Sequence, residues 1–184
     1  MSDDLVHDTT APGLDPDDWY DEHKRGLTVA VLPSRRYRRA FEPGCGDGRL
    51  TALLAARCDE VVCWDADPGA AASAAARLAD VHHVSVAQAR LPHEWPDGTA
   101  DVILLSEVGC FLTPTELDIV MEHCARTLEP GGVLVAVHRR TPTALYPGGG
   151  DDVHARLFGL RGVVRTGGYT DLDLRIDVFE RQAG

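Results

Sequence analysis

The sequence predicts an α/β fold, a doubly wound and mostly parallel sheet with helices on both faces. Short apolar runs, such as 60–65 and 101–105, have the continuous character of strands that are buried on both faces. Segments with helical periodicity alternate with them, as at 117–128, where apolar residues recur three and four positions apart. Such strand–helix alternation is typical of a parallel sheet.

Polar residues stand at the carboxyl ends of these predicted strands. In a doubly wound sheet, ligands bind beyond those ends, near the point where the strand order reverses. We therefore expect one binding site that gathers the residues Glu42, Asp65, Gln88, Ser106, Glu107 and His138.

The N-terminal part divides into a tail and a helix. Residues 1–14 carry acids and few apolar side chains, so we expect a disordered acidic tail. Residues 15–184 form one expected domain, because their number suits a single core. Asp15 as N-cap and Pro16 in the first turn predict a helix over 15–32.

Seven strands are expected after that helix. The expected strands are 39–42, 60–65, 83–87, 101–105, 133–138, 162–168 and 172–180, the last two being a pair with an antiparallel member. The expected helices follow the glycines at 44–48 and then cover 68–78, 117–128 and 151–158.

Composition excludes several classes of partner. The formal net charge of −11 argues against nucleic acid, whose binding depends on clustered cations. No apolar run is long enough for a membrane span, and we expect no membrane partner. Four arginines within 35–39 are interpreted either as a solvated connector or as an anchor for an anionic substrate.

The five cysteines indicate a reducing compartment. They are odd in number, form no C-x-x-C pair and lie largely within apolar segments. We therefore expect reduced core residues of a cytoplasmic protein. No spacing of cysteine and histidine fits a metal site, so no metal is expected.

A glycine loop follows the first strand. The pattern is Glu42-x-Gly44-x-Gly46-x-Gly48, and a helical pattern starts directly after it. Glycine tolerates positive φ and lets a ligand approach the backbone, and the start of the helix offers free N–H groups. The dinucleotide fingerprint G-x-G-x-x-G has a different spacing, which disfavours a dehydrogenase.

This loop resembles motif I of the class I S-adenosylmethionine (SAM) methyltransferases. Asp65 lies 23 residues after Glu42, where this superfamily places the acid that binds the ribose hydroxyls. Within the superfamily the chain is similar to the nodulation-protein-S-like (NodS) N-methyltransferases. The segments that carry this likeness are 19–20 with 24–25, 42–45, 91–96, 105–109 and 135–138.

The resemblance implies SAM as cofactor and S-adenosylhomocysteine as product. It implies a seven-stranded sheet with one antiparallel strand near the C-terminus, and a helix at 15–32 that covers the cofactor. The implied cofactor-binding residues are Trp19, Tyr20, Arg25, Glu42, Gly44, Gly46, Gly48, Asp65, Ala66, Gln88, Arg90, Leu91 and Ser106.

Alternatives remain for some of these positions. Trp19 and Tyr20 could be a core stripe of their helix, and Asp65 could be the N-cap of the helix after it. Many relatives have an acid that accepts from the adenine amino group, where this chain has Arg90, which can only donate. Gln88 or a backbone carbonyl could supply the acceptor.

Methyl transfer to an amine requires loss of a proton from the nucleophile and alignment of the reacting atoms. Glu107 and His138, at the ends of central strands, are the candidate catalytic residues. The alternatives are a capping or cofactor-positioning role for Glu107 and a buried, hydrogen-bonded role for His138. Tyr146 and His154, around a loop rich in proline and glycine, are candidate substrate contacts.

We therefore expect a SAM-dependent methyltransferase with a small-molecule acceptor. An amine, for example on an amino sugar, fits better than a hydroxyl. The alternatives are a small-molecule O-methyltransferase, in which His138 could be the general base, and a protein that binds SAM or its product without turnover.

Overall fold

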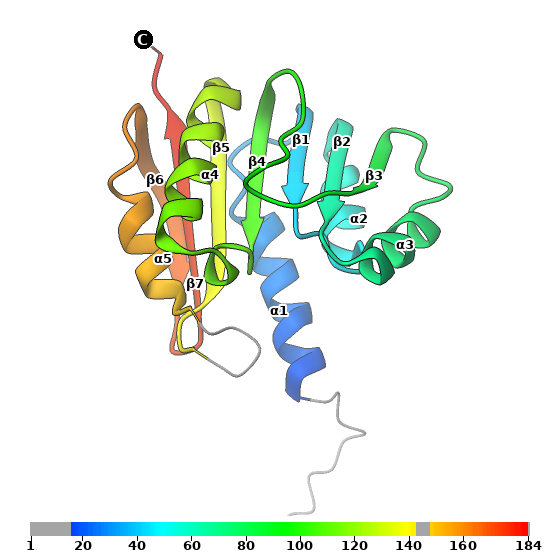
Figure 1. Ribbon diagram of the computed structural model, residues 1–184, viewed down its shortest axis with the longest axis horizontal. Coiled ribbons are helices and arrows are strands. Elements are labelled where there is room, and N and C mark those ends of the chain that lie inside the picture. Colours follow the sequence, from blue (N-terminus) through cyan, green and yellow to red (C-terminus); the bar gives the residue numbers. More distant parts are fainter. Residues whose placement is uncertain (1–15, 143–147, 184) are drawn as a thin grey trace, which may run out of the picture.

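One seven-stranded sheet forms the centre of the protein. The computed structural model describes residues 16–142 and 148–183 (Figure 1). The expected acidic tail at 1–14 and the candidate substrate contact Tyr146 lie outside the described residues. In the order of the chain, the elements are α1 (Pro16–Ala30), β1 (Tyr37–Pro43), α2 (Arg49–Ala55), β2 (Cys58–Asp65), α3 (Pro68–Arg77), β3 (Val84–Gln88), β4 (Ala100–Ser106), the 3-10 turn η1 (Gly109–Phe111), α4 (Pro114–Thr127), β5 (Leu128–Arg139), α5 (Gly150–Leu157), β6 (Val163–Thr170) and β7 (Leu174–Arg181).

The strand order confirms the predicted doubly wound sheet. The strands lie side by side in the order β3-β2-β1-β4-β5-β7-β6. The pairs among β1 to β5 are parallel, whereas β7 runs antiparallel to both β5 and β6. The strand order reverses between β1 and β4. The chain therefore leaves the end of β1 toward one face of the sheet and the end of β4 toward the other face. This is the position at which such sheets bind ligands.

Alternation along the strands divides the core between the two faces. In β5, Val133, Val135 and Val137 belong to one core cluster, while Leu134 and Ala136 belong to another. The first cluster also contains side chains of α1 and α2, and the second contains side chains of α4 and α5. Successive strand residues point to opposite faces, so two apolar faces require a helical layer on each side. Figure 1 shows α4 and α5 in front of the sheet, with α1 and α2 behind it.

Local signals fix the helix starts. The Thr113 hydroxyl accepts from the Glu116 backbone N–H, and the Glu116 carboxylate accepts in return from the Thr113 N–H, which is a capping box at the start of α4. Asp67 is the N-cap of α3, where its side chain accepts from Ala70 N at 2.7 Å. The alternative role of Asp65 as this N-cap is therefore wrong, and its carboxylate is left for another task.

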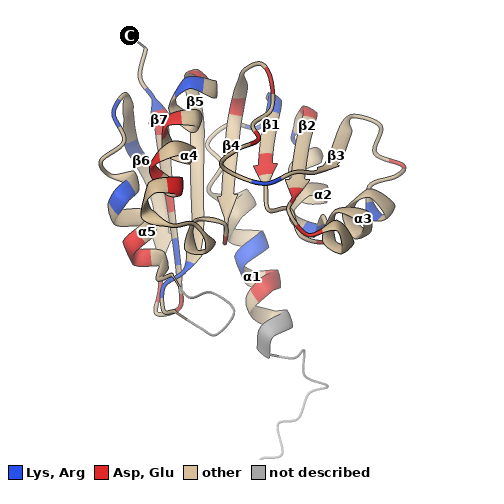
Figure 2. Ribbon diagram, viewed as in Figure 1, with Lys and Arg blue, Asp and Glu red and all other residues tan. Residues whose placement is uncertain are grey.

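The arginines before and within β1 lie far from the glycine loop. Arg38 pairs with Asp101 at 3.2 Å and Arg39 with Glu60 at 2.9 Å, at the amino end of the strand. Figure 2 shows this basic start of β1 and the acidic residue at its other end. These ion pairs agree with the connector interpretation and not with an anchor for the substrate. None of the helices in the described part of the chain is long and apolar enough to span a membrane.

Candidate active site

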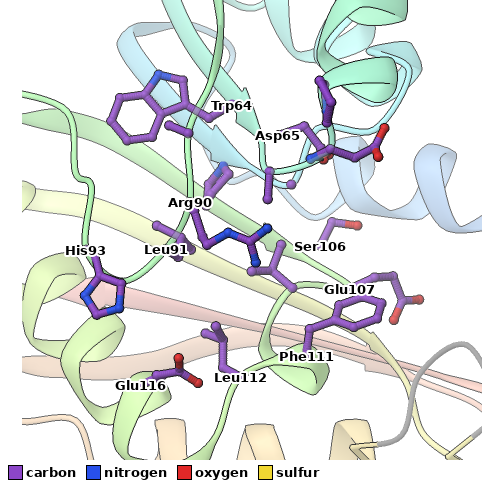
Figure 3. Close-up of a pocket in the computed structure, with 17 residues that line it drawn as sticks. Trp64, Asp65, Arg90, Leu91, His93, Ser106, Glu107, Phe111, Leu112 and Glu116 are labelled. Atoms are coloured by element: carbon purple, nitrogen blue, oxygen red, sulfur yellow. Dashed lines mark hydrogen bonds between the residues drawn. The ribbon is translucent and has the colours of Figure 1, made fainter.

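A cavity of about 660 Å³ opens beyond the carboxyl ends of β1, β2 and β4 (Figure 3). It contains both apolar and charged side chains, as is usual for small-molecule sites. Its lining consists of Pro43, Gly44, Trp64, Asp65, Ala66, Asp67, Pro68, Ala89, Arg90, Leu91, His93, Ser106, Glu107, Val108, Phe111, Leu112 and Glu116. Seven of the residues predicted for the site are among them: Gly44, Asp65, Ala66, Arg90, Leu91, Ser106 and Glu107.

Gly44, the first residue of the glycine loop, lines the cavity next to β1, whereas Gly46 and Gly48 lie outside the lining. Gly44, Gly46 and Gly48 have φ values of 71°, 56° and 79°, in the left-handed region that favours glycine. A Cβ on Gly44 would overlap Cγ2 of Val108, which belongs to the opposite wall. A Cβ on Gly48 would crowd Ala74 and Leu78 at 3.1 Å, where α2 begins against α3. Gly44 therefore allows the close approach of two walls, whereas Gly48 allows the packing of two helices.

Asp65 ties the glycine loop to the end of β2. Its Oδ2 accepts from Gly46 N at 2.8 Å and its Oδ1 accepts from Asp67 N at 2.9 Å. Each carboxylate oxygen can accept a further hydrogen bond, so the group keeps acceptor capacity toward the cavity that it lines. The residue thus has a structural role in addition to any contact with a ligand.

Glu42 is a buried carboxyl at the end of β1. The side chain is 1% exposed, and its Oε2 has no hydrogen-bond partner among the described residues. Burial raises the pKa of Glu42 from 4.5 to about 8, opposed by the neighbouring Thr51 hydroxyl. A buried polar atom without a partner is costly and is found where a ligand or a functional state supplies the partner.

Arg90 and Gln88 differ in their relation to the cavity. Figure 3 shows the Arg90 side chain extending into the middle of the cavity, between Leu91 and Ser106. Gln88 ends β3 outside the lining, and its Nε2 donates to Ala66 O at 3.5 Å. Arg90 rather than Gln88 is therefore placed to contact a bound molecule.

The Glu107 carboxylate accepts hydrogen bonds from three groups. Its Oε1 accepts from the Tyr20 hydroxyl at 3.2 Å and from Lys24 Nζ at 3.4 Å. The backbone N–H of Arg139 lies 3.2 Å from Oε1 and 3.1 Å from Oε2. Glu107 also has φ 58°, a left-handed conformation that costs a residue with a Cβ about 1–2 kcal/mol. Backbone strain of this kind concentrates at functional sites, where the surroundings hold it.

The helical phase of α1 decides which of its residues reach the site. Tyr20, Lys24 and Thr28 are buried and lie four positions apart, so they share the face of α1 that meets the sheet. Lys24 also pairs with Asp21 at 3.0 Å. The Arg139 guanidinium lies over the Tyr20 ring at 3.8 Å from its centroid. Burial and the charge of Glu107 raise the pKa of Tyr20, so its hydroxyl stays a donor.

Two residues of α1 differ from their expected role. Trp19 is 56% exposed and stacks on His23, with the ring centroids 4.9 Å apart. Arg25 is half-buried and lies one position beyond Lys24, about 100° further around the helix. Neither residue lines the cavity among the described residues, and the basic residue of α1 that contacts Glu107 is Lys24.

His138 lies behind the cavity and does not line it. The residue is completely buried, and both ring nitrogens are engaged: Nε2 with Gly109 N at 3.1 Å and Nδ1 with His154 Nε2 at 3.1 Å. Burial and the neighbouring His154 hold the pKa of His138 well below its usual value. The structure agrees with the buried alternative, so we revise the role of His138 from a base to a positioning residue. His154, a candidate substrate contact, is likewise completely buried, does not line the cavity, and contacts His138 and Asp177 instead.

Sequence reasoning did not assign ten of the residues that line the cavity, among them His93, Phe111 and Leu112, and it did not assign Lys24, which contacts Glu107. Lys24 could have been found from its four-residue spacing to Tyr20, which places both on one helix face. Phe111 and Leu112 follow the predicted Ser106-Glu107 end of β4, in a turn that periodicity did not single out. His93 comes from the loop after β3, within the segment 91–96 that carries the likeness to NodS, but that likeness assigned it no role.

A family model described as "Methyltransferase domain" matches residues 41–136. A protein from Mycobacterium tuberculosis called "Probable S-adenosylmethionine-dependent methyltransferase" is 29% identical over 131 residues, which are 71% of this chain and 46% of that protein. The chain thus spans about half the length of the curated relatives it matches.

Two solved structures are similar over nearly the whole fold. A "putative Methyltransferase" from Pseudomonas syringae is 42% identical, with a TM-score of 0.78 over 89% of this chain and 99% of that one. The N-methyltransferase NodS from Bradyrhizobium japonicum WM9 is 21% identical, with a TM-score of 0.75 over 92% of this chain and 100% of that one. The likeness to NodS shows a common fold.

Proposed function

We propose that this chain, which belongs to the methyltransferase domain family, is a SAM-dependent enzyme that methylates an amine of a small molecule. One observation carries the proposal: the glycine loop and the Asp65 carboxylate meet in one cavity at the point where the strand order reverses. The same cavity holds Glu107, which gives it a polar group near the cofactor side.

The residues at the loop end of the cavity suit the parts of SAM. Asp65 offers one further lone pair on each oxygen, which suits the two adjacent hydroxyls of a ribose. Glu42 is buried next to Pro43 and outside the lining, and its unpartnered Oε2 suits the ammonium of the amino-acid part, since an added donor would satisfy a buried acceptor. NodS, which shares the fold, has been solved in complex with S-adenosylhomocysteine.

The adenine ring belongs between Ala66, Arg90 and Leu91 in this proposal. These residues line the cavity on the side of β2 and of the loop after β3. Arg90 cannot accept from the adenine amino group, but its planar guanidinium can stack on the face of an aromatic ring. Stacking by Arg90 would replace the acidic contact that many relatives are expected to use.

Helix α1 closes the site, within a single domain over residues 15–184. Tyr20 and Lys24 both donate to Glu107, so α1 is fastened to the end of β4 by two buried contacts. Lys24 is 8% exposed, and burial of a charge requires a partner of this kind. These two hydrogen bonds fix the direction of the Glu107 carboxylate, and the helix that supplies them excludes water from that side of the cavity.

SAM, when bound, supplies a methyl group on a positively charged sulfur, which is already activated for displacement. The protein then has to hold the nucleophile in line and receive its proton. Glu107 suits both tasks, because its Oε2 accepts from Arg139 N and keeps capacity for one further donor, such as an amine N–H. Lys24 and Tyr20 hold Oε1 and keep the carboxylate in place.

An amine is favoured over a hydroxyl by the state of His138. A hydroxyl nucleophile needs a true general base, and both nitrogens of the histidine considered for that role are engaged by protein groups. A neutral amine attacks with its lone pair and loses its proton only after transfer, when that proton is acidic enough for a carboxylate such as Glu107 to receive; a hydroxyl needs a stronger base. The volume of about 660 Å³ supports small molecules as substrates, including an amino sugar. The five free, buried cysteines support a cytoplasmic location.

Calorimetric titration with SAM and, separately, with NAD tests the proposal. We expect micromolar binding of SAM alone and weakening by at least about tenfold (~1.4 kcal/mol) in Asp65→Ala. Asp59→Ala is the matched control, because Asp59 lies in the same strand but pairs with the exposed Arg36 at its amino end. Its affinity for SAM should equal that of the wild type.

Binding of NAD, or failure to bind SAM, would contradict the cofactor assignment. If SAM binds, transfer of an isotopically labelled methyl group is then measured with two acceptor sets that share carbon skeletons, one bearing amines and one bearing hydroxyls. Transfer to hydroxyls alone would contradict the acceptor class, and binding without any transfer would support a protein that holds SAM without turnover.

A further inference from the structure

Three buried side chains from separate elements form a line behind the cavity. They are His138 of β5, His154 of α5 and Asp177 of β7, each 0% exposed. His138 Nδ1 lies 3.1 Å from His154 Nε2, and His154 Nδ1 lies 2.7 Å from Asp177 Oδ2. The line ends at the backbone N–H of Gly109, 3.1 Å from His138 Nε2.

The donors and acceptors in this line have only one consistent order. A backbone N–H can only donate, so His138 Nε2 carries no proton and the neutral ring is protonated at Nδ1. That Nδ1–H donates to His154 Nε2, and the second ring donates through Nδ1–H to Asp177. Each ring is thereby fixed in one tautomer and one orientation by the group behind it.

Asp177 is held as an anion at the far end. Arg165 and Arg175 both donate to its carboxylate, the latter from Nε at 2.8 Å, and these contacts with that of His154 hold the pKa of Asp177 well below its usual value. Arg175 and Arg140 also pair with Asp151, at 3.2 Å and 3.1 Å. The anionic acceptor is therefore present across the physiological pH range.

The other end of the line meets the turn η1, which belongs to the cavity wall. Gly109 begins this turn, and a Cβ there would come within 2.5 Å of Val153 and 3.0 Å of His138 Nε2. Val108 and Phe111, on either side of Gly109, line the cavity, as does Glu107 just before them. A shift of the Gly109 backbone would thus move the wall that carries the proposed catalytic carboxylate.

We propose that Asp177 and His154 are positioning residues of the active site, acting through His138 on the backbone of Gly109 and so on the wall from Glu107 to Phe111. The proposal rests on the proposed function for its effect on turnover, but the hydrogen-bond order itself does not depend on it. No proton transfer to substrate is assigned to the line, because none of its three side chains reaches the cavity.

Nitrogen-15 NMR of the histidine rings in the wild-type protein is the first test. We expect His138 to be neutral with its proton on Nδ1, which is the less common tautomer of free imidazole. A proton on Nε2 of His138 would overturn the proposal, because Gly109 N–H could then not donate to it. This measurement needs neither cofactor nor acceptor, so it stands even if the proposed function fails.

Substitution of His154 is the second test. His154→Leu removes the acceptor for His138 Nδ1–H, and we expect exchange of the Gly109 amide hydrogen to become at least tenfold faster and kcat to fall at least tenfold. His154→Gln can accept with its oxygen and donate with its nitrogen in the same order, so it should recover most of both losses. His82→Gln, at an exposed histidine, is the control.

The affinity for SAM separates this role from a general loss of structure. The glycine loop is on the other side of the cavity, so the Kd for SAM should stay within threefold of the wild type in both His154 variants. Equal Gly109 exchange in His154→Leu and wild type would overturn the proposal. If His154→Leu does not fold, the tautomer measurement and the His154→Gln variant still decide the matter. A wild type that binds no SAM would instead refute the proposed function.

Discussion

The two ends of the cavity are built in different ways. The loop end, around Gly44 and Asp65, is built from residues close together in the sequence, namely glycines, backbone N–H groups and the carboxylates of Asp65 and Asp67. The acid end, around Glu107, is built from side chains far apart in the sequence, since Tyr20 and Lys24 are 87 and 83 positions away. Backbone donors cannot be exchanged by substitution, whereas side-chain donors can. The first design suits a ligand that stays the same, and the second suits an acceptor that differs between relatives.

The largest expected effect is at the acid end. Glu107→Gln keeps the shape but removes the charge that would receive the proton of the amine, so kcat should fall by about 10²–10⁴. The affinity for SAM should change little, because this end does not hold the cofactor in our proposal. Steady-state kinetics and calorimetry check both. Glu122→Gln, on the exposed face of α4, is the control, and a Glu107→Gln enzyme with more than half of the wild-type kcat would refute the role.

A loop-end substitution should give the reverse pattern. Gly44→Ala places a methyl group against Val108 and keeps a positive φ, so we expect the Kd for SAM to rise about a hundredfold (~2.7 kcal/mol). Gly131→Ala is a matched control with φ 78° and open space around it, and it should leave the Kd unchanged.

The clash at Gly44 can itself be tested by a second substitution. Val108→Ala removes the methyl group that the new Cβ would meet, so the double variant Gly44→Ala/Val108→Ala should regain part of the lost affinity. An equal Kd for the single and double variants would show that the backbone conformation, and not the approach of the two walls, requires glycine at this position.

Two neighbouring basic residues of α1 should differ by about tenfold. Lys24→Met removes one of the contacts that hold Glu107, and we expect kcat/KM to fall about tenfold, as for the loss of a ~1.4 kcal/mol interaction in the transition state. Arg25→Met should have little effect, because this residue is half-buried on another side of the helix. The reverse result in the same kinetic assay would show that Arg25, and not Lys24, supports the active site.

The smallest effect concerns stability and pH. The pKa of Glu42 rises from 4.5 in an ordinary environment to about 8 in the folded protein. Between these values the folded state binds more protons than the unfolded state, so stability should fall as the pH rises from 4.5 to 8. Glu42→Gln cannot lose a proton and should not show this fall.

Thermal denaturation at pH 5 and pH 8 measures the contribution of Glu42. The difference in Tm between the two pH values should be at least about 2–4 °C larger in the wild type than in Glu42→Gln, the shift expected for ~1 kcal/mol. An equal difference in both proteins would show that Glu42 is already ionised. In calorimetry at pH 7, SAM binding should also release a proton if its ammonium meets Glu42.

The sheet and the loop end could be predicted because their signals are local. Continuous apolar runs gave the buried strands, and glycines at alternate positions gave the turn whose φ values the structure confirms. Asp65 could be placed because it ends a strand next to that loop in a parallel sheet, and the register pairs Glu42 with Cys63 just before it. These features need only the neighbours in the chain or in the adjacent strand.

The acid end could not be predicted in the same way. Whether Lys24 or Arg25 faces Glu107 depends on how α1 is rotated against the sheet, which packing decides. A tryptophan usually indicates burial, yet Trp19 is 56% exposed because Tyr20 takes the inward position. His138 ends a central strand as expected, but the partners that engage its ring are Gly109 of η1 and His154 of α5, which are 29 and 16 positions away in sequence.

The position of β7 also affects the order in which the protein can be completed as it leaves the ribosome. All loop-end residues precede β5, whereas Asp177 lies in β7, which inserts between β5 and β6. Until residues 174–181 have been synthesised, β5 is an open edge with a row of apolar residues from Val133 to Val137. A nascent chain can therefore form the glycine loop and place Asp65 before Asp177 is present to position the wall from Glu107 to Phe111. During that interval it exposes an aggregation-prone strand edge.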